Sequence, residues 1–113
     1  VCVENETRWL AAVARAGVFG VSVLAADQRA LAQWFATPGR PLHGQLDRAP
    51  HRRGPHTDMA LLDGALMHLE CRVTTSHAAG DHMIVVAEVL SITLPDDVGP
   101  ALVHFRGSYG SIA

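Results

Sequence analysis

The triplet Gly80-Asp81-His82 combines a turn signal with a side chain that could act on a bound ligand. Gly-Asp is typical of a hairpin, because both residues tolerate turn conformations that other side chains resist. Residues 83–94 follow as a run rich in Val, Ile, Leu and Thr, apolar on both faces. This pattern predicts a strand buried almost all round, and its length favours a barrel wall with His82 at the barrel mouth. A turn histidine without function is the alternative.

Three other histidines, His43, His51 and His56, lie in segment 37–57, which is rich in proline and arginine. No two of them have i,i+4 spacing and no cysteine lies among them, so a metal site is not expected. The arginines could meet an anionic dinucleotide, but a solvated surface loop is the default explanation for them. We therefore predict a surface loop over residues 37–57.

Two short helices should flank these candidates. Asn5-Glu6-Thr7 has the polar side chains that start a helix, and the predicted helix over residues 8–16 stops at Gly17. A second amphipathic helix is predicted over residues 27–35, capped by Asp27, with Trp34 and Phe35 in the core.

The remaining apolar runs predict strands. In residues 64–73, Leu66, His68, Glu70 and Arg72 alternate with apolar side chains, which indicates one wet face. Other strands are expected at residues 1–3, 18–24, 59–62 and 101–105, with a loop at 74–79 and a turn at 95–100. About five strands and two helices predict a small β-barrel with helices at its openings.

The composition sets further bounds. The chain has 113 residues, enough for one domain, and a net charge of −2, without the basic footprint of nucleic-acid or anionic-membrane binding. No stretch is long enough to span a membrane. Cys2 and Cys71 lie in apolar runs and are expected to be buried, reduced thiols in a cytosolic protein. Because the chain begins at Val1, without a methionine and within a predicted strand, we expect the sequence to have lost its beginning.

Four segments together resemble the flavin reductases of the FMN-binding split-barrel family, the small partners of two-component monooxygenases. The segments are residues 1–7, residues 17–36, residues 69–89 with Gly80-Asp81-His82, and residues 102–109. The resemblance implies a mainly β fold with short helices, a six-stranded Greek-key split β-barrel. The whole chain, residues 1–113, is then a single domain that lacks its N-terminal strands.

The same resemblance implies an NAD(P)H:flavin oxidoreductase. It would reduce FMN or FAD by hydride transfer from NADH or NADPH, and supply reduced flavin to a partner monooxygenase. A cytoplasmic homodimer with flavin at or near the subunit interface is implied as well. No acid–base dyad is needed, because the cofactor carries the hard chemistry and the protein orients the two rings.

The family pattern also implies the site residues. Thr7 falls where the family contacts the flavin phosphate, in a binding loop with Asn5 and Glu6, and a helix start of this kind suits an anion. His82 matches the family histidine at the nicotinamide and flavin rings. The implied site comprises His82 as the catalytic residue, Asn5, Glu6, Thr7, Ser22, His82 and Tyr109 for cofactor binding, and no metal ligand.

Two departures from the family pattern are visible. Ser22 stands where the family commonly has Asn, and Trp9 where it often has a second Ser or Thr. A non-catalytic flavin- or haem-binding split barrel shares the fold, so it remains an alternative, as does a ligand-free dimerisation domain.

Overall fold

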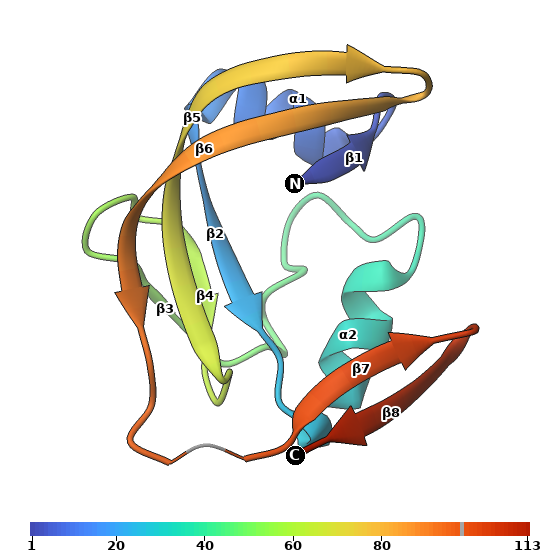
Figure 1. Ribbon diagram of the computed structural model, residues 1–113, viewed down its shortest axis with the longest axis vertical. Coiled ribbons are helices and arrows are strands. Elements are labelled where there is room, and N and C mark those ends of the chain that lie inside the picture. The colour runs from blue at the N-terminus through green and yellow to red at the C-terminus, as the bar shows by residue number, and fades with distance from the viewer. Residues whose placement is uncertain (98) are drawn as a thin grey trace.

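A long antiparallel hairpin dominates the computed structural model, which describes residues 1–97 and 99–113. Its strands are β5 (Met67–Ala79) and β6 (His82–Thr93), joined at Gly80, whose φ of 60° suits glycine. Short strands flank the hairpin, β1 (Cys2–Glu4) beside β6 and β2 (Val18–Val23) beside β5, giving the sheet order β1-β6-β5-β2. The sheet curls into a half-barrel (Figure 1). The predicted hairpin turn is confirmed.

Helix α1 (Arg8–Ala16) lies under the curve of this hairpin (Figure 1). Thr7 caps its start, and Gly17 ends it in the left-handed conformation with φ 73°, so both predicted ends are confirmed. Val13 on its inner face packs with Phe19, Cys71 and Val85 in the main core cluster. The core therefore lies between α1 and the concave face of the sheet.

Strand β6 is buried on one face only. Val85 is buried, whereas Ile84 and Val86 on the alternating face are exposed. Val89 and Ile92, which pair with Cys71 and Leu69 across a register shift, are exposed as well. The prediction of a strand buried almost all round is wrong, because β6 is covered by the core on its concave side and by nothing in the described chain on the other. The prediction of a loop at 74–79 is also wrong, because β5 continues as a strand through these residues. The hairpin therefore extends well beyond the core at α1.

A second, small hairpin covers the end of the sheet formed by β2 and β5. Its strands are β3 (His51–Arg53) and β4 (Ala60–Leu62), paired in register. Ala49 and Gly54 are buried, so the predicted surface loop over 37–57 is wrong in its C-terminal part. That segment is ordered by packing on the sheet rather than by its own apolar periodicity.

The β3–β4 hairpin packs against three polar side chains of the sheet, Ser22, His68 and Glu70. Ser22 stands opposite His68 in the β2–β5 register, and Glu70 follows on the same face of β5. His68 and Glu70 are only 5% and 2% exposed. The predicted wet face of residues 64–73 is therefore wrong at these two positions, although Arg72 is exposed and pairs with Glu88.

Glu70 fixes the loop between β3 and β4. One carboxylate oxygen, Oε1, accepts hydrogen bonds from the His56 and Thr57 amides and the Thr57 hydroxyl, at 2.8–3.0 Å. Burial acts to raise the pKa of Glu70, but the Thr57 and His56 hydrogen bonds and the nearby His56 outweigh it and hold the pKa below its ordinary value. Gly54 is required beside it, because a Cβ there would lie 2.1 Å from Oε1.

The remaining elements form a separate group at the C-terminal end (Figure 1). Strands β7 (Ala101–Phe105) and β8 (Ser108–Ile112) pair as a hairpin beside the 3₁₀ helix η1 (Ala26–Gln28), and α2 (Arg29–Ala36) follows η1. Strand β7 was predicted and β8 was not. The predicted turn at 95–100 includes residue 98, which lies outside the described residues.

Two predictions about the second helix are wrong. Asp27 does not cap α2, which begins after Gln28 without a side-chain cap. The side-chain contact in this region is at η1, where Gln28 Oε1 accepts the Ala25 amide at 2.9 Å. No residue of α2 is buried and Trp34 is 38% exposed, because the helix packs on the small η1 turn and the following loop rather than on the core. Trp34 donates its indole N–H to the Gln45 carbonyl, a polar contact that apolar spacing does not reveal.

The cysteines are only partly as expected. Both thiols are free and Cys71 is buried, where burial raises the pKa of the thiol. Cys2 is exposed, because it lies on the short edge strand β1 with its side chain away from the core.

The Glu70 carboxylate predicts an acid-sensitive fold. A group with a lowered folded pKa stabilises the protein above its unfolded value of about 4.3, and this stability is lost as pH falls through the folded value. Glu70→Gln should lower the free energy of unfolding at pH 7 by about 2 kcal/mol, since the hydrogen bonds lose their charge assistance. It should also flatten the pH dependence below about pH 4.3 in urea unfolding.

Glu88→Gln is the matched control. Glu88 sits in an exposed pair with Arg72, so its neutralisation should leave both the stability and the acid profile close to wild type. An acid profile of Glu70→Gln that coincides with that of wild type would contradict the role assigned to the buried carboxylate.

Candidate functional site

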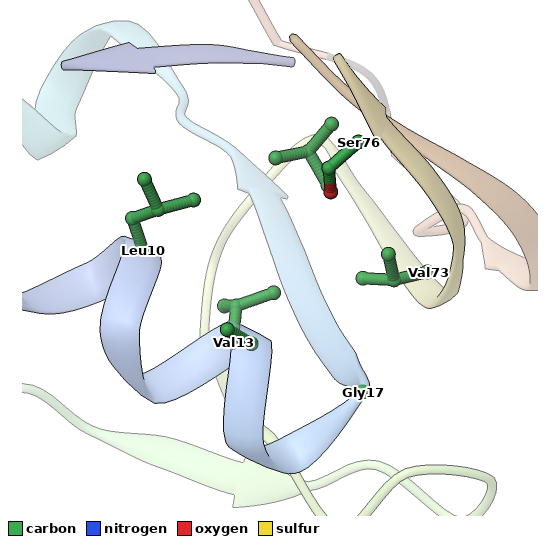
Figure 2. A pocket seen from close by; sticks show the side chains of 7 residues that line it. Leu10, Val13, Gly17, Val73 and Ser76 are labelled. Carbon is green, nitrogen blue, oxygen red and sulfur yellow. The ribbon is translucent and has the colours of Figure 1, made fainter. Parts of the chain in front are cut away.

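Two cavities lie on neighbouring faces of α1, and Val13 lines both. The smaller, about 360 Å³, opens between α1 and the β5–β6 hairpin, with Leu10 and Val13 on one side and Val73 and Ser76 on the other (Figure 2). Ser76 contributes the one side-chain hydroxyl of its lining. This pocket has no charged group to orient a polar ligand.

The larger cavity is an open groove of about 1050 Å³. It is bounded by one face of α1, by β2, by α2 and the segment that follows it, and by β4 of the small hairpin. We call it the groove. A volume of this size suits a cofactor-sized ligand, and the lining combines aromatic walls with a polar end.

The polar end of the groove is built around the start of α1. Thr7 Oγ1 accepts the Leu10 amide at 3.3 Å and donates to the Glu4 carbonyl at 3.1 Å. The Arg8 and Trp9 amides belong to the first turn, whose N–H groups have no partner within the helix. These amides and the positive end of the helix favour an anion such as a phosphate.

Two arginines border the same end. Arg8 donates to the Arg40 carbonyl at 2.8 Å, which ties the loop after α2 to the start of α1. The Arg40 guanidinium donates to the Phe35 and Thr37 carbonyls, both at 2.6 Å, and so holds that loop in a fixed fold. Both arginines line the groove, and neither forms a salt bridge within the described residues. The polar end therefore carries two guanidinium groups that have no ion-pair partner in the described chain, beside the single carboxylate of Glu6.

The walls of the groove are largely apolar. Trp9 and Phe19 meet edge to face with ring centroids 5.3 Å apart. Further apolar side chains complete the walls: Leu24, Phe35, Leu46, Met59 and Leu62. A flat, mostly apolar ring system with an anionic tail matches this distribution.

The structure brings three of the predicted site residues to the groove. Glu6, Thr7 and Ser22 line it. The Ser22 hydroxyl accepts the Leu62 amide at 3.0 Å, and its own proton remains available to a ligand.

Asn5 and His82 lie together just outside the groove lining. The Asn5 amide donates to the Asp81 carbonyl at 2.9 Å, and its side chain donates to the Gly80 carbonyl at 3.3 Å. Asn5 thus holds the β5–β6 turn next to the start of α1, with His82 opposite Glu4 in the sheet.

His82 is half-exposed, and its Nδ1 contacts Asp81 Oδ1 at 2.8 Å. Since a carboxylate only accepts, Nδ1 carries the proton, which leaves Nε2 of the neutral ring as an acceptor. The hydrogen bond from His82, and the charge of the ring whenever it is protonated, lower the pKa of Asp81. Asp81 therefore orients the ring and leaves Nε2 open to solvent.

Tyr109 lies apart from these groups, on β8. Its ring meets His104 edge to face at 5.1 Å, and the Arg29 guanidinium lies 5.6 Å from the ring centroid. It does not line the groove. These contacts do not join Tyr109 to the groove, so its implied part in cofactor binding stays a prediction.

The sequence-based reasoning missed Arg8 and Arg40 as groove residues. Arg8 directly follows the capping residue, a position whose exposure to an anion could have been inferred from the predicted helix start. Arg40 is one of the arginines of segment 37–57 that were considered for an anionic dinucleotide, but no periodicity in that segment distinguished it from a solvated loop arginine. Within residues 1–97 and 99–113, no helix is long and apolar enough to cross a membrane.

The chain belongs to the flavin reductase like domain family, whose sequence description matches residues 1–113. It is 35% identical over 112 residues to an NADH-dependent flavin reductase of a Rhodococcus species, covering 99% of this chain and 59% of that protein. It is 34% identical to the reductase component of a 4-nitrophenol 4-monooxygenase/4-nitrocatechol 2-monooxygenase from Rhodococcus opacus, covering 97% of this chain and 56% of that protein.

The fold has close structural relatives. BorF, the flavin reductase component of a bacterial two-component tryptophan halogenase, superposes with a TM-score of 0.92 at 38% identity, covering 99% of this chain and 70% of BorF. The split-barrel fold class is therefore confirmed. The chain spans less than two thirds of the length of either Rhodococcus relative.

The cap geometry gives a prediction for the polar end. Thr7→Ala removes the hydroxyl that fixes the first turn of α1, so the amides that would face a phosphate lose their alignment. We expect the dissociation constant for FMN, measured by fluorescence quenching, to rise about tenfold. Thr7→Ser keeps the cap and should bind like wild type. Equal affinity in Thr7→Ala and Thr7→Ser would remove Thr7 from the site.

Proposed function

We propose that the protein is an NAD(P)H:flavin oxidoreductase that reduces FMN or FAD. The observation that carries this proposal is the groove, with the start of α1 and two arginines at one end and aromatic walls beyond it. Family membership supports the same reading.

The groove residues fit a flavin. The Thr7-capped amides, together with Arg8, would hold the phosphate, and the apolar walls with Trp9 and Phe19 would cover the ring system. When bound, flavin supplies the hydride-accepting chemistry: a reduced nicotinamide loses a hydride, and the flavin takes it up with one proton. The protein's part is to bind and orient both rings and to limit water between them.

We assign His82 to the nicotinamide side. Asp81 holds its ring through Nδ1, so Nε2 can accept a hydrogen bond from a carboxamide N–H. Asn5 fixes the turn that carries this histidine and lies two residues from Thr7. The contact between Asn5 and the turn thus connects the phosphate end with the residue proposed to orient the hydride donor.

We also propose a cytoplasmic homodimer that passes reduced flavin to a partner monooxygenase. The exposed apolar side chains of β6, Ile84 and Val86 on its outer face and Val89 and Ile92 further along the strand, support self-association, because exposed apolar surface gains from being covered. The relative that is a reductase component of a monooxygenase supports the choice of partner.

A non-catalytic flavin-binding protein is the second candidate. The observation in its favour is that His82 does not line the groove, so the groove could hold flavin without a positioned hydride donor. Oxidation of NADH, followed at 340 nm with and without added FMN or FAD, separates the two functions. We expect oxidation that depends on flavin; bound flavin without turnover would identify a binding protein.

The assignment of His82 gives the next prediction. His82→Ala should slow NADH-dependent bleaching of bound flavin about tenfold in stopped flow, because a misplaced hydride donor reacts slowly, while flavin affinity stays near wild type. His77→Ala, at an exposed position on the same hairpin, is the control and should react like wild type. If His82→Ala is reduced as fast as His77→Ala, His82 is a turn residue only.

A further inference from the structure

The backbone of Leu62 is held from both sides by one cross-strand pair. The Leu62 amide donates to Ser22 Oγ at 3.0 Å, and the Leu62 carbonyl contacts His68 Nε2 at 2.6 Å. Ser22 on β2 and His68 on β5 are direct partners in the sheet register. We call this arrangement the Leu62 clamp. It joins β4 to the main sheet by side chains, where no backbone ladder links the two sheets.

The contacts of His68 define its tautomer. A carbonyl oxygen only accepts, so Nε2 must carry the proton that reaches Leu62. On the other side of the ring, Arg52 Nη2 lies 3.2 Å from Nδ1, and a guanidinium only donates, so Nδ1 must accept. The ring is 5% exposed and both nitrogens are used. His68 is therefore a fixed neutral donor to Leu62, held in place by Arg52 of β3.

The Leu62 clamp holds one end of the β3–β4 hairpin, and Glu70 holds the other. Glu70 binds the 56–57 turn, while Ser22 and His68 hold Leu62 at the end of β4. Between them the hairpin packs tightly on β2, since a Cβ on Gly20 would lie 3.0 Å from Leu61 Cδ2. With close packing in the middle, the two polar contacts determine how the hairpin is oriented on the sheet.

We propose that His68 is a positioning residue for the groove, acting through Leu62. Met59, Ala60 and Leu62 of the hairpin line the groove, as does Ser22 itself. Without the His68 donor, the Leu62 carbonyl loses its partner, and this wall of the groove is free to shift. This inference rests on the proposed flavin-binding function. It adds His68, which does not line the groove, as a residue that controls the shape of the groove.

The test compares His68→Leu with His68→Gln in the full chain. Leucine fills the space without a donor, whereas the glutamine amide can donate to Leu62 and accept from Arg52. In His68→Leu we expect hydrogen exchange of the Leu62 amide to accelerate about tenfold relative to the Val73 amide, and the dissociation constant for FMN to rise about tenfold. His68→Gln should restore both. The reduction rate at saturating FMN should stay within about twofold in both variants.

Cys71→Ala controls for a merely structural effect. It removes a buried sulfur on the core face of the same strand, so it should destabilise the fold and accelerate the Leu62 and Val73 amides together. In the wild-type protein, the ¹⁵N shifts of His68 should report the neutral tautomer protonated at Nε2.

The outcomes separate this inference from the proposed function. Unchanged Leu62 exchange in His68→Leu overturns the clamp, and selective exchange with wild-type FMN affinity overturns its role in the groove. A wild-type chain that does not bind FMN or FAD overturns the proposed function, and with it the role of His68 toward flavin. The exchange comparison then still confirms or overturns the clamp itself.

Discussion

The buried carboxylate of Glu70 is the constraint on which the functional half of the molecule depends. No lysine or arginine neutralises it in the described chain, so its charge is supported by donors from one short turn, the His56 and Thr57 amides and the Thr57 hydroxyl. A buried charge that loses such donors is costly. The β3–β4 hairpin must therefore stay against the sheet, and Gly54 must lack a side chain for the turn to approach.

The position of that hairpin determines the shape of the groove. Glu70 fixes its turn and the Leu62 clamp fixes the end of β4, so a wall of the groove is set by polar contacts that lie behind it. The opposite wall belongs to α1. The Thr7 side chain fixes the start of this helix, and Arg8 in its first turn donates to the Arg40 carbonyl in the loop after α2. The flavin site that we propose is thus assembled from two units that touch the sheet on different faces. One is held by apolar packing and the other by hydrogen bonds.

The sequence predicted the parts of this arrangement that have local signals. The α1 helix has a capping threonine and a terminal glycine, and the β5–β6 turn has its glycine, so both were found. The strict alternation in β5 predicted one solvent-exposed face, because alternation shows only which side chains are polar. It cannot show that a hairpin from a proline-rich segment will cover His68 and Glu70. Arg40 was not distinguished from the other arginines of segment 37–57, because its position is fixed by carbonyls of a loop without periodicity. The family resemblance supplied the flavin, which no local pattern could have given.

We propose that flavin occupies the groove between α1 and the small hairpin. Amide chemical shifts of the ¹⁵N-labelled chain, followed during titration with FMN, can locate the bound flavin. We expect the amides of Arg8 and Trp9, at the polar end, and of Leu62, on the opposite wall, to move along one saturating curve. The amides of Phe105 and Ser108, in the β7–β8 hairpin, should stay in place. Saturable shifts confined to β7 and β8, with the α1 and β4 amides unmoved, would contradict this proposal.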